Sequence, residues 1–204
     1  AAAIAAGDDH CLVLCSDGTL AGWGANEGSL GNDIATDSNV PVLVDMSGVL
    51  KGKTVTAIAA GYHHSLALCS DGTVAAWGDN AYGAVGNSNS SAALSPVLVD
   101  TTGVLSGKAV TAIAASSDQS LALCGDGTLV SWGYNYYGEL GNGTTVTSSS
   151  SPVLVNQSGV LSGKTITAIS AGSNHDAVLC SDGTLAGWGY GYDGELGNAT
   201  NTSS

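Results

Sequence analysis

Short apolar runs bounded by turn residues recur along the chain and predict β-strands. One stretch shows the pattern, with mostly apolar runs at Val55–Gly61, His64–Cys69 and Thr73–Gly78, then a polar segment and the short run Pro96–Val99. Runs of this length between Gly, Asp and Ser clusters are typical of strands. Ser70–Gly72 joins the second and third runs, and its glycine supplies the positive φ that a tight hairpin turn needs. Because the runs are almost continuously apolar, we expect sheets that are covered on both faces.

The same pattern occurs four times. Asp-Gly-Thr recurs at intervals of 54, 55 and 56 residues, and a tryptophan follows each aspartate by six residues. Each "PVLV" proline is followed by a tryptophan 36 residues later, whereas the distance from tryptophan to the next proline grows from 18 to 20 residues. A constant length indicates structure and a varying length indicates a surface loop. The repeated aspartates are Asp17, Asp71, Asp126 and Asp182, and the tryptophans are Trp23, Trp77, Trp132 and Trp188.

Units of about 50 residues with four strands each are the signature of β-propeller blades. We therefore expect an all-β fold, a single propeller array over residues 1–204 with repeats at approximately 1–54, 55–109, 110–165 and 166–204. The chain ends at Ser204, just where a fourth "SPVLV" is due. The prediction is an incomplete ring of about four blades, of which the last lacks its outer strand. Each "PVLV" proline is expected at the first position of an outer strand, where proline is tolerated.

The segment "AIAAGYHHSLALCSDGTVAAWGDNAYGAVG" resembles the repeat of the regulator-of-chromosome-condensation family, as found in its bacterial members too. The pattern runs AAG-x-x-HS-L-AL-x-x-DG-x-V-x-x-WG-x-N-x-x-G-x-LG, and the resemblance covers the whole chain four times. It implies a propeller, usually of seven blades. The family includes a chromatin-bound exchange factor, a plant ultraviolet photoreceptor and a secreted bacterial β-lactamase inhibitor, so fold does not fix function. The chain departs from the pattern at Gln119, which replaces histidine, and at Cys11 and Ala177, taken as the equivalents of Ser65.

The charge balance excludes several classes of partner. The net charge is −13, with four lysines and no arginine. Phosphate backbones and anionic membrane surfaces require basic residues, so we expect no nucleic-acid and no membrane binding. Apolar runs are also far too short to span a bilayer. The Ser/Thr-rich, lysine-poor composition favours an extracellular or cell-surface bacterial protein, whereas the free cysteines weigh against it, and the localisation stays open.

Residue types that could carry chemistry occur at equivalent repeat positions and do not converge. His10, His64 and His175 lie one blade apart, which favours hydrogen bonding to a neighbouring loop over metal binding or acid–base work. The five cysteines contain no C-x-x-C pair, and equivalent positions on packed sheets lie too far apart for disulfides. The Asp-Gly turns lack the ladder of acidic residues that a calcium loop requires. We expect no catalytic residue, no metal and no cofactor, and an enzyme ranks last among the functional hypotheses.

Propeller topology divides the loops between two faces. We call "upper" the face that carries the first-to-second turns and third-to-fourth loops, and "lower" the face that carries the hairpin turns and the linkers between blades. All four lysines fall on the lower face with six acids, and all seven tyrosines fall on the upper face with eleven acids. A tyrosine-rich face of one charge sign is typical of a binding surface.

The leading hypothesis is a non-enzymatic protein-binding propeller whose partner, possibly basic, is bound on the upper face. The alternative is a purely structural or self-assembling array, part of a longer surface or secreted protein. We also expect self-association through the exposed end blades. A structural interpretation of the tyrosines themselves is that they only cover the blade ends. The candidate partner-binding residues are Tyr62, His63, Tyr82, Asp118, Tyr134, Tyr136, Tyr137, Asn174, Tyr190 and Tyr192.

Overall fold

The computed structural model describes residues 1–144 and 146–203, and these residues form four antiparallel sheets. In each sheet the strands are hydrogen-bonded in chain order, and η1 (Gly159–Leu161) is the one short 3-10 helix of the described residues. The strands are β1 (Ala3–Ala6), β2 (His10–Leu14), β3 (Leu20–Gly24), β4 (Ser38–Leu43), β5 (Val55–Ala60), β6 (His64–Cys69), β7 (Val74–Gly78), β8 (Ala93–Leu98), β9 (Val110–Ala115), β10 (Gln119–Cys124), β11 (Leu129–Tyr134), β12 (Ser148–Leu154), β13 (Ile166–Ala171), β14 (His175–Cys180) and β15 (Leu185–Gly189).

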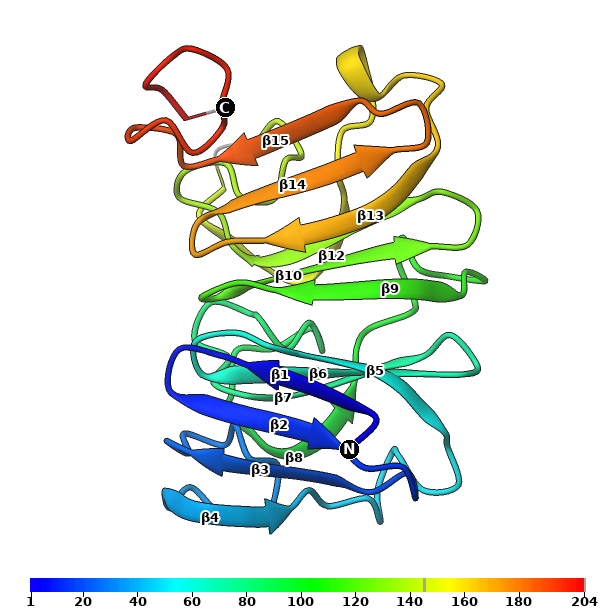
Figure 1. Ribbon diagram of the computed structural model, residues 1–204, viewed down its shortest axis with the longest axis vertical. Helices are drawn as coiled ribbons and strands as arrows, with labels where there is room; N and C mark the ends of the chain where they lie inside the picture. The colour runs from blue at the N-terminus through cyan, green and yellow to red at the C-terminus, as the bar shows by residue number, and fades with distance from the viewer. Residues whose placement is uncertain (145, 204) are drawn as a thin grey trace.

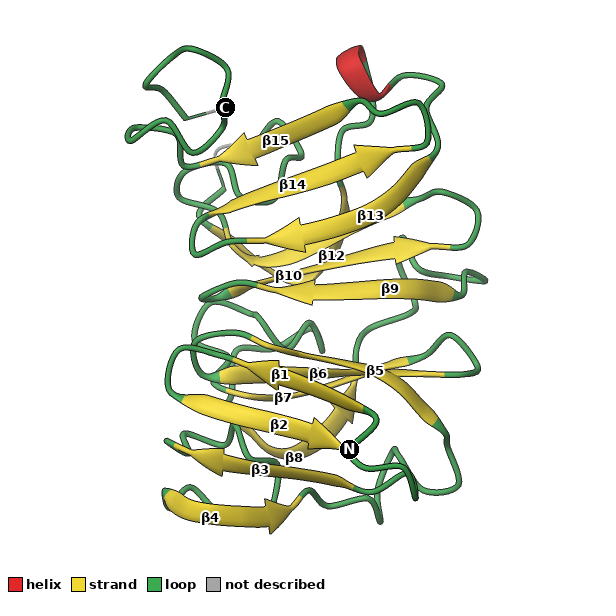
Figure 2. Cartoon of the chain, viewed as in Figure 1, coloured by secondary structure: helices red, strands yellow, loops and turns green. Residues whose placement is uncertain are grey.

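Each sheet is one blade, and the blades follow one another along the molecule from blue β1–β4 to orange β13–β15 (Figure 1). The first strands of successive blades are in contact, β1 with β5, β5 with β9 and β9 with β13. These strands are the innermost of their sheets, as expected from their small side chains. The secondary structure is almost entirely strand and loop (Figure 2). The predicted all-β propeller is confirmed, with three four-stranded blades and a fourth of three strands.

The core lies between blades, because the apolar side chains of both sheet faces pack against the neighbouring sheets. Trp77 and Trp132 are fully buried there. The end blades show what is lost without a neighbour. Leu129, which opens β11 in the third blade, is 0% exposed, whereas its repeat equivalent Leu185 in the fourth blade is 73% exposed. In the first blade Ile4 is 79% exposed. Both ends of the array therefore present open apolar faces.

The Asp-Gly turns are hairpin turns, as predicted. Gly72 has a φ of 81°, and the Asp71 Oδ1 atom accepts hydrogen bonds from the backbone N–H and the hydroxyl of Thr73. The Lys53 Nζ atom lies 2.5 Å from the Asp71 carboxylate, which ties the linker before the blade to its hairpin. The same ion pair recurs in the next two blades, Lys108 with Asp126 and Lys164 with Asp182. The lysines and these turns thus share the lower face.

The position of proline in the outer strands was predicted wrongly. Pro96 does not begin β8, because the strand starts three residues earlier at Ala93. The register between β7 and β8 shifts between Ala76 and Gly78, so Pro96 falls opposite Trp77 within the irregular part of the ladder. A missing N–H costs little at such a bulge on an outer strand. Pro41 and Pro152 likewise lie inside β4 and β12.

All five cysteines are free, as predicted, and Cys69, Cys124 and Cys180 are buried. None of the described residues forms a helix long and apolar enough to cross a membrane.

Candidate binding face

The turns that build the upper face are held in place by a repeated set of hydrogen bonds between blades. His10 Nε2 of the first blade lies 2.9 Å from the hydroxyl of Ser65 in the second, and this hydroxyl donates to the backbone oxygen of Ser29 in the first blade. Trp77 Nε1 donates to the same oxygen at 2.8 Å. His64, Ser120, Ala84 and Trp132 repeat the arrangement between the second and third blades. His10 and His64 have a structural role, and each bonds to a serine of the next blade.

Glycine permits this close contact. Gly86 has a φ of 72°, and a Cβ atom on it would lie 2.5 Å from Nε1 of Trp132. The glycine lets the loop backbone of one blade lie directly on the tryptophan of the next.

The junction between the third and fourth blades uses different residues. Gln119 Nε2 donates to the Asp176 Oδ2 atom at 2.7 Å and to the backbone oxygen of Glu139 at 3.3 Å, and Trp188 Nε1 donates to that same oxygen. Asp176 occupies the position of Ser65, directly after the repeat's histidine, so the assignment of Ala177 to that position was wrong. A glutamine–aspartate pair here takes the place of the histidine–serine pair at the other two junctions.

Burial controls the ionisation of the junction residues. It lowers the pKa of His10 to about 4 and that of His64 to about 3, so both rings are neutral near pH 7. Burial also raises the pKa of Asp176 to about 8 and, with a smaller opposing effect from backbone N–H groups, raises the pKa of Glu139. Glu139 and Asp176 are each 1% exposed. The count of eleven acids on the upper face was therefore too high, and nine lie at or near the surface.

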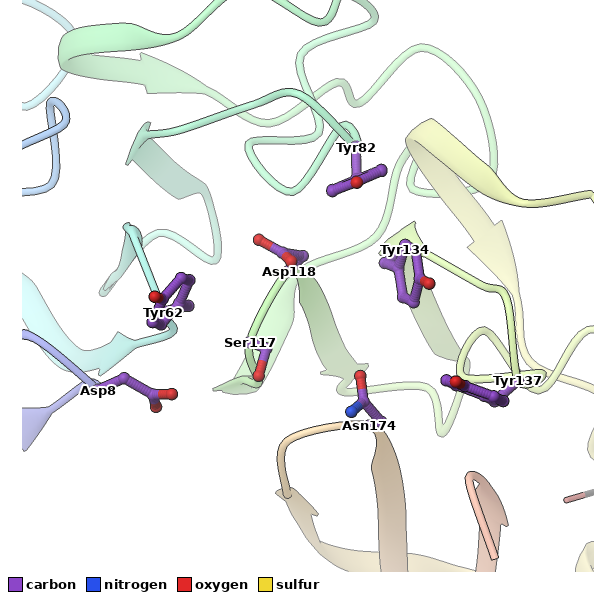
Figure 3. A pocket seen from close by; sticks show the side chains of 8 residues that line it. All are labelled: Asp8, Tyr62, Tyr82, Ser117, Asp118, Tyr134, Tyr137 and Asn174. Atoms are coloured by element: carbon purple, nitrogen blue, oxygen red, sulfur yellow. The ribbon is translucent and has the colours of Figure 1, made fainter. Parts of the chain in front are cut away.

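A cavity of about 450 Å³ lies at the centre of the upper face (Figure 3). The first-to-second turns of all four blades reach it and contribute Asp8, Tyr62, Ser117, Asp118 and Asn174, and the third strand and loops of the second and third blades add Tyr82, Tyr134 and Tyr137. Backbone hydrogen bonds join neighbouring turns, from Tyr62 N to Ser117 O at 2.8 Å and from Ser117 N to Ser173 O at 3.4 Å. The cavity exists because the blades bring these turns together around the propeller axis.

The tyrosines form a continuous aromatic row that runs over three blades. Tyr82 of the second blade packs edge-to-face on Tyr134 of the third, with ring centroids 4.9 Å apart. Tyr137 makes an edge contact with Tyr190 of the fourth blade at 4.9 Å, and Tyr136 and Tyr192 extend the row. Offset and edge-to-face pairs of this kind are favourable. The rings of Tyr82, Tyr136 and Tyr192 nevertheless stay exposed.

The predicted candidate residues divide between two neighbouring hollows. Six of them line the central cavity, namely Tyr62, Tyr82, Asp118, Tyr134, Tyr137 and Asn174. Tyr136 and Tyr192 line a second hollow of about 460 Å³, which shares Tyr137 with the first. Tyr190 lies in the aromatic row between them.

The side chain of the candidate residue His63 is half-buried and lies outside both hollows. Its ring lies 3.9 Å from that of Tyr62, centroid to centroid. Sequence reasoning missed Asp8 and Ser117, which also line the central cavity. The sequence contained a clue to both residues, because each lies in a first-to-second turn, the same kind of turn that carries Tyr62 and Asp118.

Asp118 is the most distinctive charged group of the cavity. It is half-buried, and no side chain in the described part of the chain donates a hydrogen bond to its carboxylate. Burial raises the pKa of Asp118, and the carboxylates of Asp79 and Asp8 raise it further, while His63 opposes them. Within residues 1–144 and 146–203, no group of three or more His, Cys, Asp or Glu side chains is arranged to hold a metal ion.

Comparisons with known proteins agree with this architecture. The profile of the regulator of chromosome condensation (RCC1) repeat matches residues 17–68, 71–123 and 126–179, and a second profile of this repeat matches 1–28, 55–84, 110–139 and 166–195. The ultraviolet-B receptor UVR8 of Arabidopsis thaliana is 32% identical over 199 residues, 97% of this chain and 43% of the receptor. The human E3 ubiquitin-protein ligase HERC2 is 33% identical over 201 residues, which are 97% of this chain and 4% of the ligase.

Solved structures show the same fold. Human WBSCR16 superposes with a TM-score of 0.84 at 29% identity, over 98% of this chain and 49% of that protein. Yeast RCC1 (Prp20), solved bound to Kap60, gives a TM-score of 0.80 at 22% identity, over 99% of this chain and 46% of that one. The chain thus spans less than half the length of these relatives. The repeat profiles match more than half of its residues, and the chain belongs to the regulator of chromosome condensation (RCC1) repeat family.

Proposed function

We propose that the chain is a non-enzymatic protein-binding propeller that holds a basic protein partner on its upper face. The observation that carries the proposal is the aromatic row, from Tyr82 to Tyr192, on a face whose surface charges are all acidic. Tyrosine offers a large contact area with few rotatable bonds to immobilise, which suits interface anchors.

Charge selects the kind of partner. Nine carboxylates lie at or near the surface of this face, whereas three of the four lysines are held in ion pairs on the lower face. Such a face attracts a basic protein during encounter and repels an acidic one. For the same reason we expect no binding to nucleic acids or to anionic membranes.

Relatives support a binding role by analogy. Yeast RCC1 (Prp20) was solved bound to Kap60, and a further structure of Prp20p from Saccharomyces cerevisiae is described with its binding properties to Gsp1p and histones. The ligase activity named for HERC2 is not carried over, because this chain aligns with 4% of that protein.

The test is capture of proteins from a native extract on the immobilised chain, followed by elution with rising salt. The proposal expects basic proteins that elute as salt screens the charges, and their loss when Tyr136, Tyr137 and Tyr192 are replaced with serine. Lys51→Ser, an exposed change in a lower-face linker, is the matched control. Equal capture by all variants would place binding elsewhere.

A structural, self-assembling array is the second candidate, favoured by the open apolar face of the fourth blade. Leu179 and Leu185 are 39% and 73% exposed there, and about 25 cal/mol is gained per Å² of apolar surface that association removes from water.

A further inference from the structure

We propose that the central cavity of the upper face is a pocket for one alkylammonium group, the end of a lysine side chain of the bound partner. The inference rests on the proposed function, because it names the chemical group by which a basic partner is held. At about 450 Å³ the cavity falls within the size range of pockets that bind small groups.

The walls of the cavity are aromatic on several sides. Tyr82 and Tyr134 meet at an interplanar angle of 70° and so form a corner, and Tyr137 stands on the far side of Tyr134 (Figure 3). Tyr62 faces this group across Asp118. The faces of aromatic rings carry partial negative charge and attract an ammonium group that lies within about 6 Å of the ring centre.

The base of the cavity supplies charge and hydrogen-bond acceptors. The Asp118 carboxylate lies among the tyrosines, half-buried and without a salt bridge in the described residues, and His63 is the one basic side chain that lowers its pKa. Asp8 and the carboxamide of Asn174 border the same space. A lysine ammonium has three N–H donors and no acceptor, and these oxygens are able to accept them. An incoming ammonium group would therefore pair with a partly desolvated carboxylate that forms no salt bridge within the described residues.

Other ligand classes fit less well. An anion meets the carboxylates of Asp8, Asp79 and Asp118 without a compensating lysine. A metal ion would find no group of three or more His, Cys, Asp or Glu side chains to bind it in the described part of the chain. An uncharged apolar group would bury Asp118 without pairing it, which is costly.

The test uses three probes, an acetylated and amidated Gly-Lys-Gly peptide, the same peptide with norleucine for lysine, and butylammonium chloride. Binding is followed by NMR of the protein and by competition. We expect the lysine peptide to bind, butylammonium to compete with it, and the norleucine peptide not to bind. Asp118→Asn should weaken lysine-peptide binding about tenfold, and Tyr134→Leu about threefold.

A matched control separates the pocket from the acidic surface as a whole. Asp17→Asn removes one exposed acid from a hairpin turn of the lower face, outside the cavity, and should leave peptide binding unchanged. Thermal melting checks that every variant folds. Equal binding of the norleucine peptide, or equal binding by wild type, Asp118→Asn and Tyr134→Leu, would overturn the pocket.

The two proposals fail in different ways. If capture of basic proteins depends on Tyr136 and Tyr192 but binding of the lysine peptide does not depend on Asp118, the proposed function is supported and the lysine pocket is wrong. If the peptide binds as expected but no protein is captured, the lysine pocket is supported and the proposed function is wrong.

Discussion

Asp176 should make the stability of the chain fall as the pH rises from 6.5 to 8. Its side chain is 1% exposed at the junction of the third and fourth blades, and burial raises its pKa to about 8 from an ordinary value of 3.8. Between these values the folded state holds a proton that the unfolded state has released. The free energy of unfolding then falls by about 1.4 kcal/mol for each pH unit.

The neighbouring groups set the window in which this slope is visible. His10 and His64 are buried with pKa values of about 4 and about 3, below the ordinary 6.5. Below pH 6.5 the unfolded state protonates both rings and the folded state does not, so their contribution to stability is lost as the pH falls. Above pH 6.5 they are neutral in both states. Burial also raises the pKa of Glu139, so this residue, like Asp176, makes stability fall as the pH rises. From Asp176 and the two histidines, stability should be greatest near pH 6.5 and about 2 kcal/mol lower at pH 8.

Asp176→Asn isolates the effect. Asparagine has the shape of the protonated acid and still accepts the hydrogen bond from Gln119, but it does not ionise. The measurement is urea unfolding followed by tryptophan fluorescence at several pH values from 5 to 8.5. We expect the decline above pH 6.5 to vanish in the variant, while the acid side of the profile, which comes from the histidines, remains.

A second variant rebuilds the junction in the form of the other two. Gln119→His with Asp176→Ser should also remove the decline of stability above pH 6.5. Because it adds a third buried histidine, it should make the free energy of unfolding fall more steeply below pH 6.5. Parallel profiles of wild type and Asp176→Asn between pH 6.5 and 8, or a wild-type stability that rises over this range, would refute the reasoning.

Three further predictions concern packing, thiols and assembly. Gly86→Ala should destabilise the chain by about 2 kcal/mol or more in urea unfolding, because the new Cβ atom would clash with Trp132. The control is Gly143→Ala, which has a similar φ of 71° but open space around it and should cost about 1 kcal/mol. Equal losses of stability in the two variants would speak against the close contact at Gly86. All five cysteines should react with a thiol reagent once the non-reduced protein is unfolded, and a count below five would show that a disulfide forms. Light scattering at high micromolar concentration should detect self-association through the end blades, weakened by Leu185→Ser, and a strictly monomeric species would argue against it.

The sequence predicted the architecture well because the repeat constrains it four times. The constant 36-residue spacing from proline to tryptophan runs from the outer strand of one blade to the third strand of the next, and the Asp71 turn and its equivalents mark each hairpin between a second and a third strand. The proline error arose because Pro96 was treated as a strand boundary, whereas the register shift opposite Trp77 lets the strand continue through it.

The site was predicted only in part, for a geometric reason. Sorting loops by face placed Tyr62, Asp118 and Asn174 on the upper side, and Asp8 occupies the equivalent turn of the first blade. The sequence did not show that these turns converge on one cavity. The same sorting counted Glu139 and Asp176 as surface acids. Their burial comes from contact between successive blades, which a repeat alignment read one blade at a time does not reveal.

The central claim, that the upper face binds a basic partner, is tested most directly by mapping a basic probe onto the chain. The measurement is the change of amide chemical shifts in the isotope-labelled protein as a lysine 20-mer is added, with a glutamate 20-mer as control. The account predicts that the largest changes fall on the first-to-second turns around Asp8, Tyr62, Asp118 and Asn174 and on the tyrosine loops, and that the glutamate peptide causes none. Larger changes at the hairpin turns of the lower face, or no change at millimolar lysine peptide, would contradict it.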